Sequence, residues 1–218
     1  MCSAPGGKTT HLAQLMGNKG KIFAMERGKS KLKNITTLCE RLGITCVEPI
    51  AGDSTKCLSN RTFQPHSFDR ILLDPPCSGI GLRPRFKEDT TVAQLQEHAN
   101  YQKKCTFEFF VFERLVTLTW LYFSVTVIQV AYDLLKSGGT LTYSTCTMHP
   151  LENEENVSWA LLNFPGLELV DIDSKLKLGD SGLPNCGLNE EQRNYVQRFS
   201  PTSSLDCNAF FIAKFRKK

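Results

Sequence analysis

Apolar and polar positions follow two rhythms along this chain, one typical of helices and one of short strands. The helical rhythm is clearest in residues 29–42, where the apolar positions are Leu32, Ile35, Leu38 and Leu42. Elsewhere, short apolar runs are bounded by turn residues, as in residues 68–74, which is typical of buried strands. The pattern therefore predicts an α/β protein.

The same reading along the whole chain predicts helices over residues 8–16, 29–42 and 153–164. The predicted strands are residues 21–26, 46–50, 68–74, 139–144, 167–170 and 209–215. Strands that alternate with helices indicate a mostly parallel sheet covered by helices on both faces, with ligands at the carboxyl ends of the strands. Residues 174–201, rich in Gly, Asn and Ser, are expected to form a long surface excursion.

The beginning of the chain departs from this architecture. A strand normally feeds the first glycine-rich turn of a doubly wound sheet, but here the turn Pro5-Gly6-Gly7 comes almost at once. We therefore expect a sheet that lacks its first strand, or a chain that is a fragment. Because 218 residues support one sizeable core and no linker divides the sequence, we expect one domain over residues 1–218.

Residues 115–132 run without a charge, at the lower edge of the length of a membrane span. They include Thr, Ser and Gln, and charged residues precede them, so we favour a buried helix and expect no stable membrane association. The N-terminus shows no apolar segment of a signal peptide. The nine cysteines and four histidines do not have the spacing of a zinc site, so we expect no metal. We expect mostly reduced thiols, which are typical of an intracellular protein. Within the cell, we favour the cytoplasm over the nucleus.

The hydrophobic content of 41% excludes disorder as the main state. The net charge of +4 permits a polyanionic partner without demonstrating one. A phosphate-binding P-loop is disfavoured, because its first Gly would fall on Cys2. Gly6 and Gly7 nevertheless open a helix whose N–H groups can face an anionic or zwitterionic ligand, although an ordinary turn explains them equally well.

Two acids follow the first two predicted strands. Glu26 lies 18 residues beyond Lys8, and an acid at about this distance binds ribose hydroxyls in many doubly wound folds. Asp53 suits a contact to an adenine amino group. A solvated acid and a turn-forming Asp are the simpler alternatives for these two positions.

Two cysteines follow strands in the second half of the chain. In Asp74-Pro75-Pro76-Cys77 the prolines fix the backbone directly after a strand, and Cys146 follows the strand predicted over residues 139–144. A lone Cys is usually a small buried apolar residue, but two at strand ends, one of them near an Asp, favour chemistry. A Cys–His protease is an alternative that leaves residues 74–77 unexplained.

Together these motifs resemble the NOP/Sun family of RNA cytosine-5 methyltransferases. Residues 2–9 look like its cofactor loop, residues 74–79 like its first catalytic motif, and residues 143–147 followed by Glu152-Asn153-Glu154 like its second. Residues 81–84 and 210–215 are most similar to the sixth-member, transfer-RNA-modifying subgroup.

The resemblance implies a Rossmann-like class I methyltransferase fold and S-adenosylmethionine as cofactor. The cofactor-binding residues that it implies are Cys2, Ser3, Ala4, Pro5, Gly6, Gly7, Lys8, Glu26, Asp53 and Asp74. It implies that Cys146 attacks the cytosine, that Cys77 helps to release the product and that Asp74 contacts the base. The implied partner is RNA, with transfer RNA favoured.

Two alternatives remain beside this interpretation. In the similar DNA cytosine-5 enzymes the Cys of the Pro-Cys motif attacks, which would make Cys77 the nucleophile, but the second motif around Cys146 favours the RNA class. The segment between the two motifs also carries an apparent insertion at about residues 105–125. A catalytically inactive or incomplete paralogue, with at most weak RNA binding, is the second hypothesis, and the expected lack of the first strand is the sequence feature that favours it.

Overall fold

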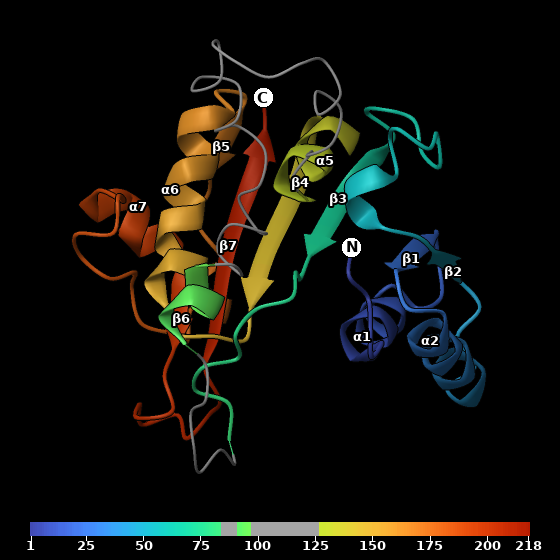
Figure 1. The fold of residues 1–218 in the computed structure, drawn as a ribbon, viewed down its shortest axis with the longest axis horizontal. Coiled ribbons are helices and arrows are strands. Elements are labelled where there is room, and N and C mark those ends of the chain that lie inside the picture. Colours follow the sequence, from blue (N-terminus) through green and yellow to red (C-terminus); the bar gives the residue numbers. More distant parts are fainter. Residues whose placement is uncertain (84–90, 97–126) are drawn as a thin grey trace. The chain divides into compact units, whose positions relative to one another are not determined.

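A computed structural model of the chain describes residues 1–83, 91–96 and 127–218. These residues form two compact units, Met1–Phe63 and Gln64–Lys218 (Figure 1). Each unit has its own sheet, and each is described by itself below. The single domain over residues 1–218 stays a prediction, and the insertion expected at about 105–125 lies outside the described residues.

The first unit consists of two parallel strands and two helices. Its elements are α1 (Gly7–Leu15), β1 (Ile22–Glu26), α2 (Lys29–Arg41), β2 (Val47–Ala51) and the short 3-10 helix η1 (Ser54–Lys56). Strand β1 pairs with β2 from Ile22 opposite Val47 to Glu26 opposite Ala51. The four longer elements match the predicted ones within one residue at either end, because each is delimited by Gly or polar turn residues.

A small core joins the helices of this unit to its strands. It is built from Ala13 of α1, Ala24 of β1, Ile35 and Cys39 of α2, and the buried Ile44 and Cys46. Gly6 stands before α1 with a φ of 109°, and a Cβ there would come within 3.3 Å of the Ile35 side chain. Gly6 therefore allows both the left-handed turn and the close approach of α1 to α2.

The second unit contains a five-stranded mixed sheet. Its strands are β3 (Phe68–Leu73), β4 (Leu135–Thr145), β5 (Leu167–Leu169), β6 (Gln197–Phe199) and β7 (Phe210–Lys217). Strand β3 is parallel to β4, whereas β7 is antiparallel to β4, β5 and β6. The sheet is thus more mixed than the alternation of strands and helices predicted, because β7 follows β6 without a crossover helix.

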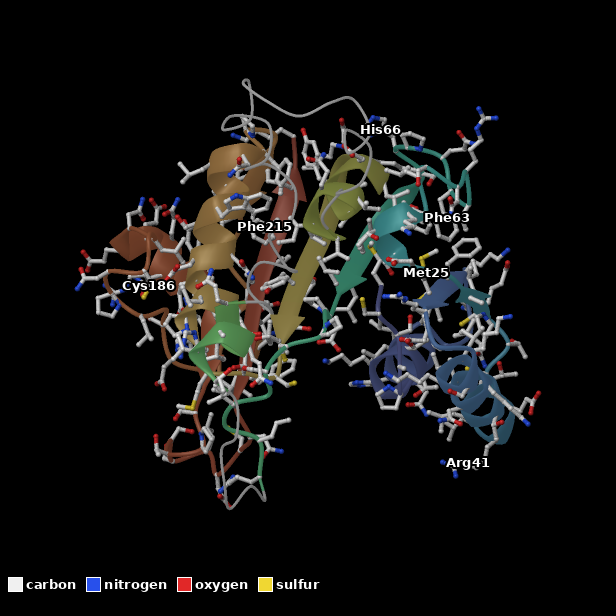
Figure 2. The ribbon with its side chains drawn as sticks, viewed as in Figure 1. Met25, Arg41, Phe63, His66, Cys186 and Phe215 are labelled. Atoms are coloured by element: carbon white, nitrogen blue, oxygen red, sulfur yellow. The ribbon has the colours of Figure 1, made fainter. Side chains whose placement is uncertain are left out.

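Two helices cover one face of this sheet (Figure 1). They are α5 (Val127–Leu134) and α6 (Glu154–Asn163), and they meet through the stacked rings of Tyr132 and Phe164, whose centroids are 5.1 Å apart. The sheet residues beneath them are fully buried and include Leu141, Tyr143, Phe211 and Phe215, the last labelled in Figure 2. Alternate residues along β4 and β7 therefore build the core, as the period of a strand requires.

The end of α5 is held by a buried lysine of the last strand. Lys217 Nζ donates to the carbonyl oxygens of Tyr132 at 2.6 Å and Leu135 at 2.9 Å, and it lies 4.1 Å from the centre of the Tyr132 ring. Burial lowers the pKa of Lys217, although Asp133 opposes this shift. The lysine satisfies carbonyls that the helix terminus leaves without partners and thereby fixes α5 against β7.

The expected surface excursion over residues 174–201 is more structured than predicted. It contains the short 3-10 helix η3 (Ser174–Leu176), helix α7 (Glu190–Tyr195) and strand β6, and Val196 and Gln197 are fully buried. A three-residue strand of mixed polarity has no readable period, and it forms because the edge of β7 offers partners. No helix within the described residues is long and apolar enough to cross a membrane, and residues 115–126 lie outside them.

Candidate functional site

The two predicted catalytic cysteines meet in the second unit. Cys77 follows β3 and Cys146 follows β4, two parallel neighbours that end at the same edge of the sheet. Their Sγ atoms lie 3.1 Å apart, and both residues are half-buried. Two thiols in hydrogen-bonding contact at the rim of a core can serve as a reactive pair.

The contact couples the two thiols, and either sulfur can donate the hydrogen bond that joins them. This hydrogen bond raises the pKa of Cys77, with burial and the nearness of Cys146 as further causes. In such a pair the S–H of one cysteine can stabilise a negative charge on the sulfur of the other.

Asp74 lies beside the same strand end. Its Oδ1 accepts a hydrogen bond from the Ser144 hydroxyl at 3.0 Å, and the residue is half-buried. Leu73 and Tyr143 are opposite each other in the parallel pair, so the residues that follow them are also neighbours. The structure accordingly brings Asp74, Cys77 and Cys146 together, as the sequence predicted.

Three consecutive polar residues behind this pair are completely buried. They are Glu152, Asn153 and Glu154, at the beginning of α6, and each is 0% exposed. Sequence analysis singled them out only as part of a motif. Each of the three binds a different segment of the second unit.

Glu152 binds the loop that carries Cys77. Its Oε1 accepts from the Ser78 backbone N–H at 3.0 Å, and its Oε2 accepts from the Ser78 hydroxyl at 2.5 Å. The same hydroxyl lies 3.0 Å from Thr147 Oγ1. Glu152 is therefore linked to the residue after each cysteine.

Asn153 fixes the backbone on both sides of Cys146. Its Oδ1 accepts from the Thr145 hydroxyl at 2.5 Å, and its Nδ2 donates to the Thr147 carbonyl at 2.9 Å. Thr145 and Thr147 are themselves fully buried. The position of Cys146 thus depends on a side chain from the next helix.

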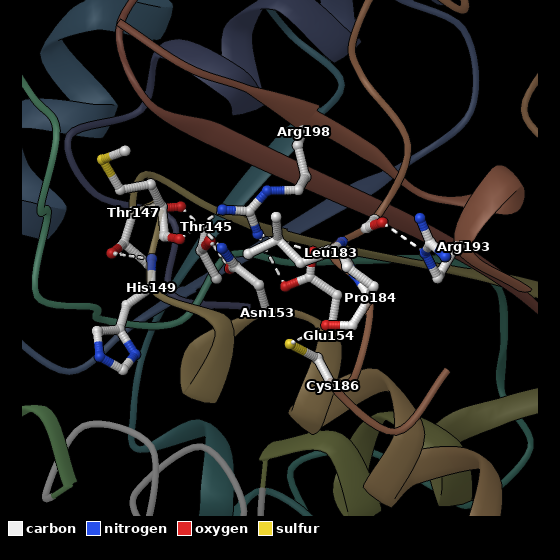
Figure 3. A network of polar contacts seen from close by, with 12 residues as sticks. Thr145, Thr147, His149, Asn153, Glu154, Leu183, Pro184, Cys186, Arg193 and Arg198 are labelled. Atoms are coloured by element: carbon white, nitrogen blue, oxygen red, sulfur yellow. Dashed lines mark hydrogen bonds and ion pairs between the residues drawn. The ribbon is translucent and has the colours of Figure 1, made fainter. Parts of the chain in front are cut away.

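Glu154 connects the site to β6 (Figure 3). Its two oxygens accept from Arg198 Nη1 at 2.7 and 2.8 Å, and Oε1 also accepts from the Leu183 N–H at 2.9 Å. Arg198 Nη2 then donates to the Met148 carbonyl at 2.5 Å. Sequence analysis missed Arg198 because it lies in the supposed surface excursion, where no local pattern marks a buried Arg.

The remaining predicted site residues lie in the first unit. Residues 2–6 precede α1, and Gly7 and Lys8 are its first two residues. The Ser3 N–H and hydroxyl both donate to the Met25 carbonyl, at 3.0 and 2.9 Å. Glu26 is half-buried at the end of β1, and its two oxygens accept from the N–H groups of Ala4 at 3.2 Å and Gly28 at 3.1 Å. One carboxylate therefore holds the glycine-rich turn at the carboxyl end of a strand.

Asp53 caps η1. Its Oδ1 accepts from the Thr55 N–H at 3.0 Å and from the Thr55 hydroxyl at 2.7 Å. Burial alone would raise the pKa of Asp53, but the hydrogen bonds from Thr55, with Arg27 and Lys56 nearby, outweigh burial, so the pKa is lowered. The turn-forming interpretation of Asp53 is thus realised, and Oδ1 is engaged in it.

Neither unit shows an arrangement suited to a metal ion. No three His, Cys, Asp or Glu side chains converge to hold one within residues 1–83, 91–96 and 127–218.

Comparison with known families matches almost the whole chain to one of them. The family described as 16S rRNA methyltransferase RsmB/F matches residues 1–106 and 120–216. All of the predicted site residues fall in these two segments, Cys146 in the second and the others in the first.

Individual relatives agree with this match. The chain is 36% identical to the mouse (Mus musculus) tRNA (cytosine(72)-C(5))-methyltransferase NSUN6, over 100% of this chain and 47% of the relative. It is 35% identical to the tRNA (cytosine(72)-C(5))-methyltransferase of Pyrococcus horikoshii, over 100% of this chain and 46% of the relative. The chain thus spans about half the length of these relatives.

The fold agrees as well. The crystal structure of NSun6 from Pyrococcus horikoshii with SFG superposes with a TM-score of 0.78 at 34% identity, covering 100% of this chain and 46% of that one. A Rossmann-like class I methyltransferase fold, expected from the motifs, is therefore confirmed.

Proposed function

The chain belongs to the RsmB/F methyltransferase family, and on that premise we propose that it methylates the C5 carbon of cytosine in RNA, with transfer RNA as the substrate. The observation that carries this proposal is the 3.1 Å contact between Cys77 and Cys146. Its relatives are tRNA (cytosine(72)-C(5))-methyltransferases, which supports the choice of RNA and of base.

Cytosine C5 needs activation, because this carbon is a poor nucleophile. A thiolate that adds to C6 makes C5 enamine-like, so that it can attack an electrophilic methyl group. We assign this attack to Cys146, because it lies in the second motif and its sulfur is 3.1 Å from that of Cys77, whose thiol can stabilise a negative charge on Cys146 by a hydrogen bond. In the DNA-type assignment Cys77 would attack instead, and the second motif around Cys146 favours the RNA type.

Cys77 can lose its proton more easily once Cys146 has reacted. The largest cause of its raised pKa is the hydrogen bond with Cys146, and the charge of Cys146 adds to it. When Cys146 Sγ is bonded to C6, it no longer carries this charge, and the Cys77 thiol can release its own proton to solvent. The resulting Cys77 thiolate then accepts the C5 proton. The electron pair of the C5–H bond restores the C5–C6 double bond, and the bond from C6 to Cys146 breaks, which leaves Cys146 as a thiolate and releases the methylated base.

Asp74 is assigned to the flat edge of the base. Its Oδ1 accepts from Ser144, which orients the carboxylate at the strand end next to the cysteines. A carboxylate in this place can accept a hydrogen bond from the exocyclic amine of cytosine. The base must leave its stack to reach the pair, at about a few kcal/mol and less in a single-stranded end.

The first unit contains residues that fit S-adenosylmethionine, and the archaeal NSun6 structure was solved with its analogue SFG. A Cβ on Gly7 would meet nothing within 4 Å, so the turn offers open space beside the first N–H groups of α1. The carboxylate of Glu26 lies directly at this turn, in the place where an acid binds ribose hydroxyls. When bound, S-adenosylmethionine would supply an electrophilic methyl group.

Trapping of a covalent RNA adduct tests the proposal. The chain and its Cys77→Ala and Cys146→Ala variants are incubated with S-adenosylmethionine and a tRNA transcript, and protein–RNA bonds are scored on denaturing gels. We expect Cys77→Ala to accumulate an adduct that Cys146→Ala cannot form. The reverse pattern would assign the attack to Cys77.

Cofactor binding provides the accompanying measurement. Calorimetric titration with S-adenosylmethionine and S-adenosylhomocysteine should show one site per chain. A folded chain that binds neither ligand and forms no adduct would support the inactive paralogue instead.

A further inference from the structure

A buried chain of hydrogen bonds connects the two cysteine loops. The residue after Cys77 is Ser78 and the residue after Cys146 is Thr147, and their hydroxyl oxygens are 3.0 Å apart. Ser78 is 8% exposed and Thr147 is 0% exposed. The two loops are therefore joined directly behind the reactive sulfurs, through side chains to which the proposed mechanism gives no role.

Glu152 determines which hydroxyl donates and which accepts in this chain of hydrogen bonds. The Ser78 hydroxyl donates its one proton to Glu152 Oε2, 2.5 Å away. The Ser78 oxygen then accepts from the Thr147 hydroxyl. The second carboxylate oxygen accepts from the Ser78 N–H at 3.0 Å, which holds the backbone as well as the side chain.

Glu152 is itself fixed from the strand that carries Cys146. Its carbonyl oxygen accepts from the Tyr143 hydroxyl at 2.6 Å and from Asn156 Nδ2 at 3.2 Å. Tyr143 is 1% exposed and precedes Cys146 by three residues on β4. Glu152 thus contacts β4 through its main chain and the Cys77 loop through its side chain.

We propose that Glu152 is a positioning residue that sets the distance between Cys77 and Cys146. It touches neither sulfur, and it acts through Ser78 and Thr147. The inference rests on the proposed function, because it concerns the geometry that lets Cys77 act on an adduct formed at Cys146. Without the carboxylate, the Cys77 loop loses both of its buried contacts to Glu152, and Cys77 moves away from Cys146.

Disulfide trapping measures this distance without RNA or cofactor. Diamide removes one hydrogen from each thiol and joins the sulfurs while it is itself reduced to the hydrazine. Sulfurs at 3.1 Å need to approach by about 1 Å to reach the S–S bond length. The rate of Cys77–Cys146 bond formation, followed by mass spectrometry of the joined peptides, therefore reports how the loops are held.

The variants form a graded series. We expect Glu152→Ala to slow the cross-link about tenfold, and Ser78→Ala to slow it by a smaller factor, because Ser78→Ala leaves the backbone contact intact. Glu152→Gln keeps an acceptor for the Ser78 N–H and should stay within about threefold of the unchanged chain. The matched control is Glu190→Ala, at an exposed position of α7, with an unchanged rate.

A second readout separates positioning from loss of structure. In the presence of tRNA and S-adenosylmethionine, Ser78→Ala should accumulate the covalent adduct, as expected for Cys77→Ala, because Cys146 still attacks while Cys77 is displaced. A variant that is merely destabilised would form less adduct.

Failure of this inference can be distinguished from failure of the proposed function. Cross-linking at the unchanged rate in both Ser78→Ala and a folded Glu152→Ala, judged by circular dichroism, would overturn the positioning role. Absence of any cross-link in the unchanged chain would do the same. If the graded series appears but no chain forms an RNA adduct, the positioning of the thiols stands and the methyltransferase proposal fails.

Discussion

The two units hold their candidate site residues in different ways. In the first unit, Glu26 and Asp53 are half-buried and bind N–H groups two residues ahead, those of Gly28 and Thr55. In the second unit, Glu152 and Glu154 are fully buried and bind residues 74 and 44 positions away, Ser78 and Arg198. Glu26 also accepts from the Ala4 N–H, 22 positions away. The first site thus combines local turns with half-buried contacts between them, whereas the second depends on fully buried contacts between distant segments.

This difference predicts which substitutions should change ligand affinity and which should change stability. A change in the first unit removes a surface-accessible contact, so we expect it to alter ligand affinity more than stability. A change behind the cysteines leaves buried polar groups without partners, so we expect it to alter stability as well as chemistry. The predictions below test this contrast in order of decreasing effect.

The largest effect is expected from Arg198→Ala. This change leaves the fully buried Glu154 carboxylate without its cation and the Met148 carbonyl without a donor. Breaking a buried ion pair from one side costs about 3–5 kcal/mol. Denaturant unfolding should show this loss, whereas Arg83→Ala, which breaks an exposed pair with Asp206, should cost less than about 1 kcal/mol.

Asn153→Ala should have the next largest effect. It removes the partners of the Thr145 hydroxyl and the Thr147 carbonyl, both buried, at about 1–3 kcal/mol for each group left unsatisfied. The same unfolding measurement applies. Asn163→Ala, at the last residue of α6, is the control, because its amide donates to the Trp159 carbonyl one turn back in the same helix. An equal loss in both variants would contradict the account.

Glu26→Gln should weaken the binding of S-adenosylmethionine about tenfold while the Cys77–Cys146 cross-linking rate stays unchanged. The amide nitrogen that replaces one carboxylate oxygen cannot accept from Ala4 or Gly28, so the turn and the proposed ribose contact are both disturbed. Calorimetry measures the affinity. The control is Glu48→Gln on β2, an exposed carboxylate paired with Lys21, and equal weakening by both variants would remove the assignment of Glu26.

The smallest effect concerns the pH dependence of the first unit. The pKa of Asp53 is lowered, so its contribution to stability is present above the ordinary pKa of an Asp and is lost as the pH falls through the depressed value. Thr55→Val removes the hydroxyl donor and should raise the pKa of Asp53. Acid unfolding should then begin at a higher pH, with a change of about a few tenths of a kcal/mol for this half-exposed group. If the Thr55→Val variant and the unchanged chain began to unfold at the same acidic pH, the role of Thr55 in lowering the pKa of Asp53 would be contradicted.

The same contrast explains what the sequence could predict. The elements of the first unit, and the meeting of Cys77 with Cys146, follow from short-range patterns and from the rule that parallel strands end at one edge. The family assignment, made from three motifs, is confirmed by the match over residues 1–106 and 120–216. Motifs and strand ends are local features, and they can therefore be predicted from the sequence.

The supporting network could not be read in this way. Arg198 lies in a stretch that looked like an exposed excursion, and nothing in its neighbourhood indicates that it reaches Met148 and Glu154. The partners of Glu152 and Asn153 are set by the register of β3, β4 and α6, which no single segment encodes. Long-range buried hydrogen bonds therefore limited the prediction, although their acids belong to a recognised motif.

Peptide mapping of the RNA adduct tests the central claim most directly. The Cys77→Ala variant is allowed to react with a tRNA transcript and S-adenosylmethionine, the RNA and protein are digested, and the cysteine that carries the nucleotide is identified by mass spectrometry. The account predicts a methylated cytosine on Cys146. A nucleotide on any other cysteine, or a Cys77→Ala chain that binds the cofactor and RNA yet carries no nucleotide, would contradict it.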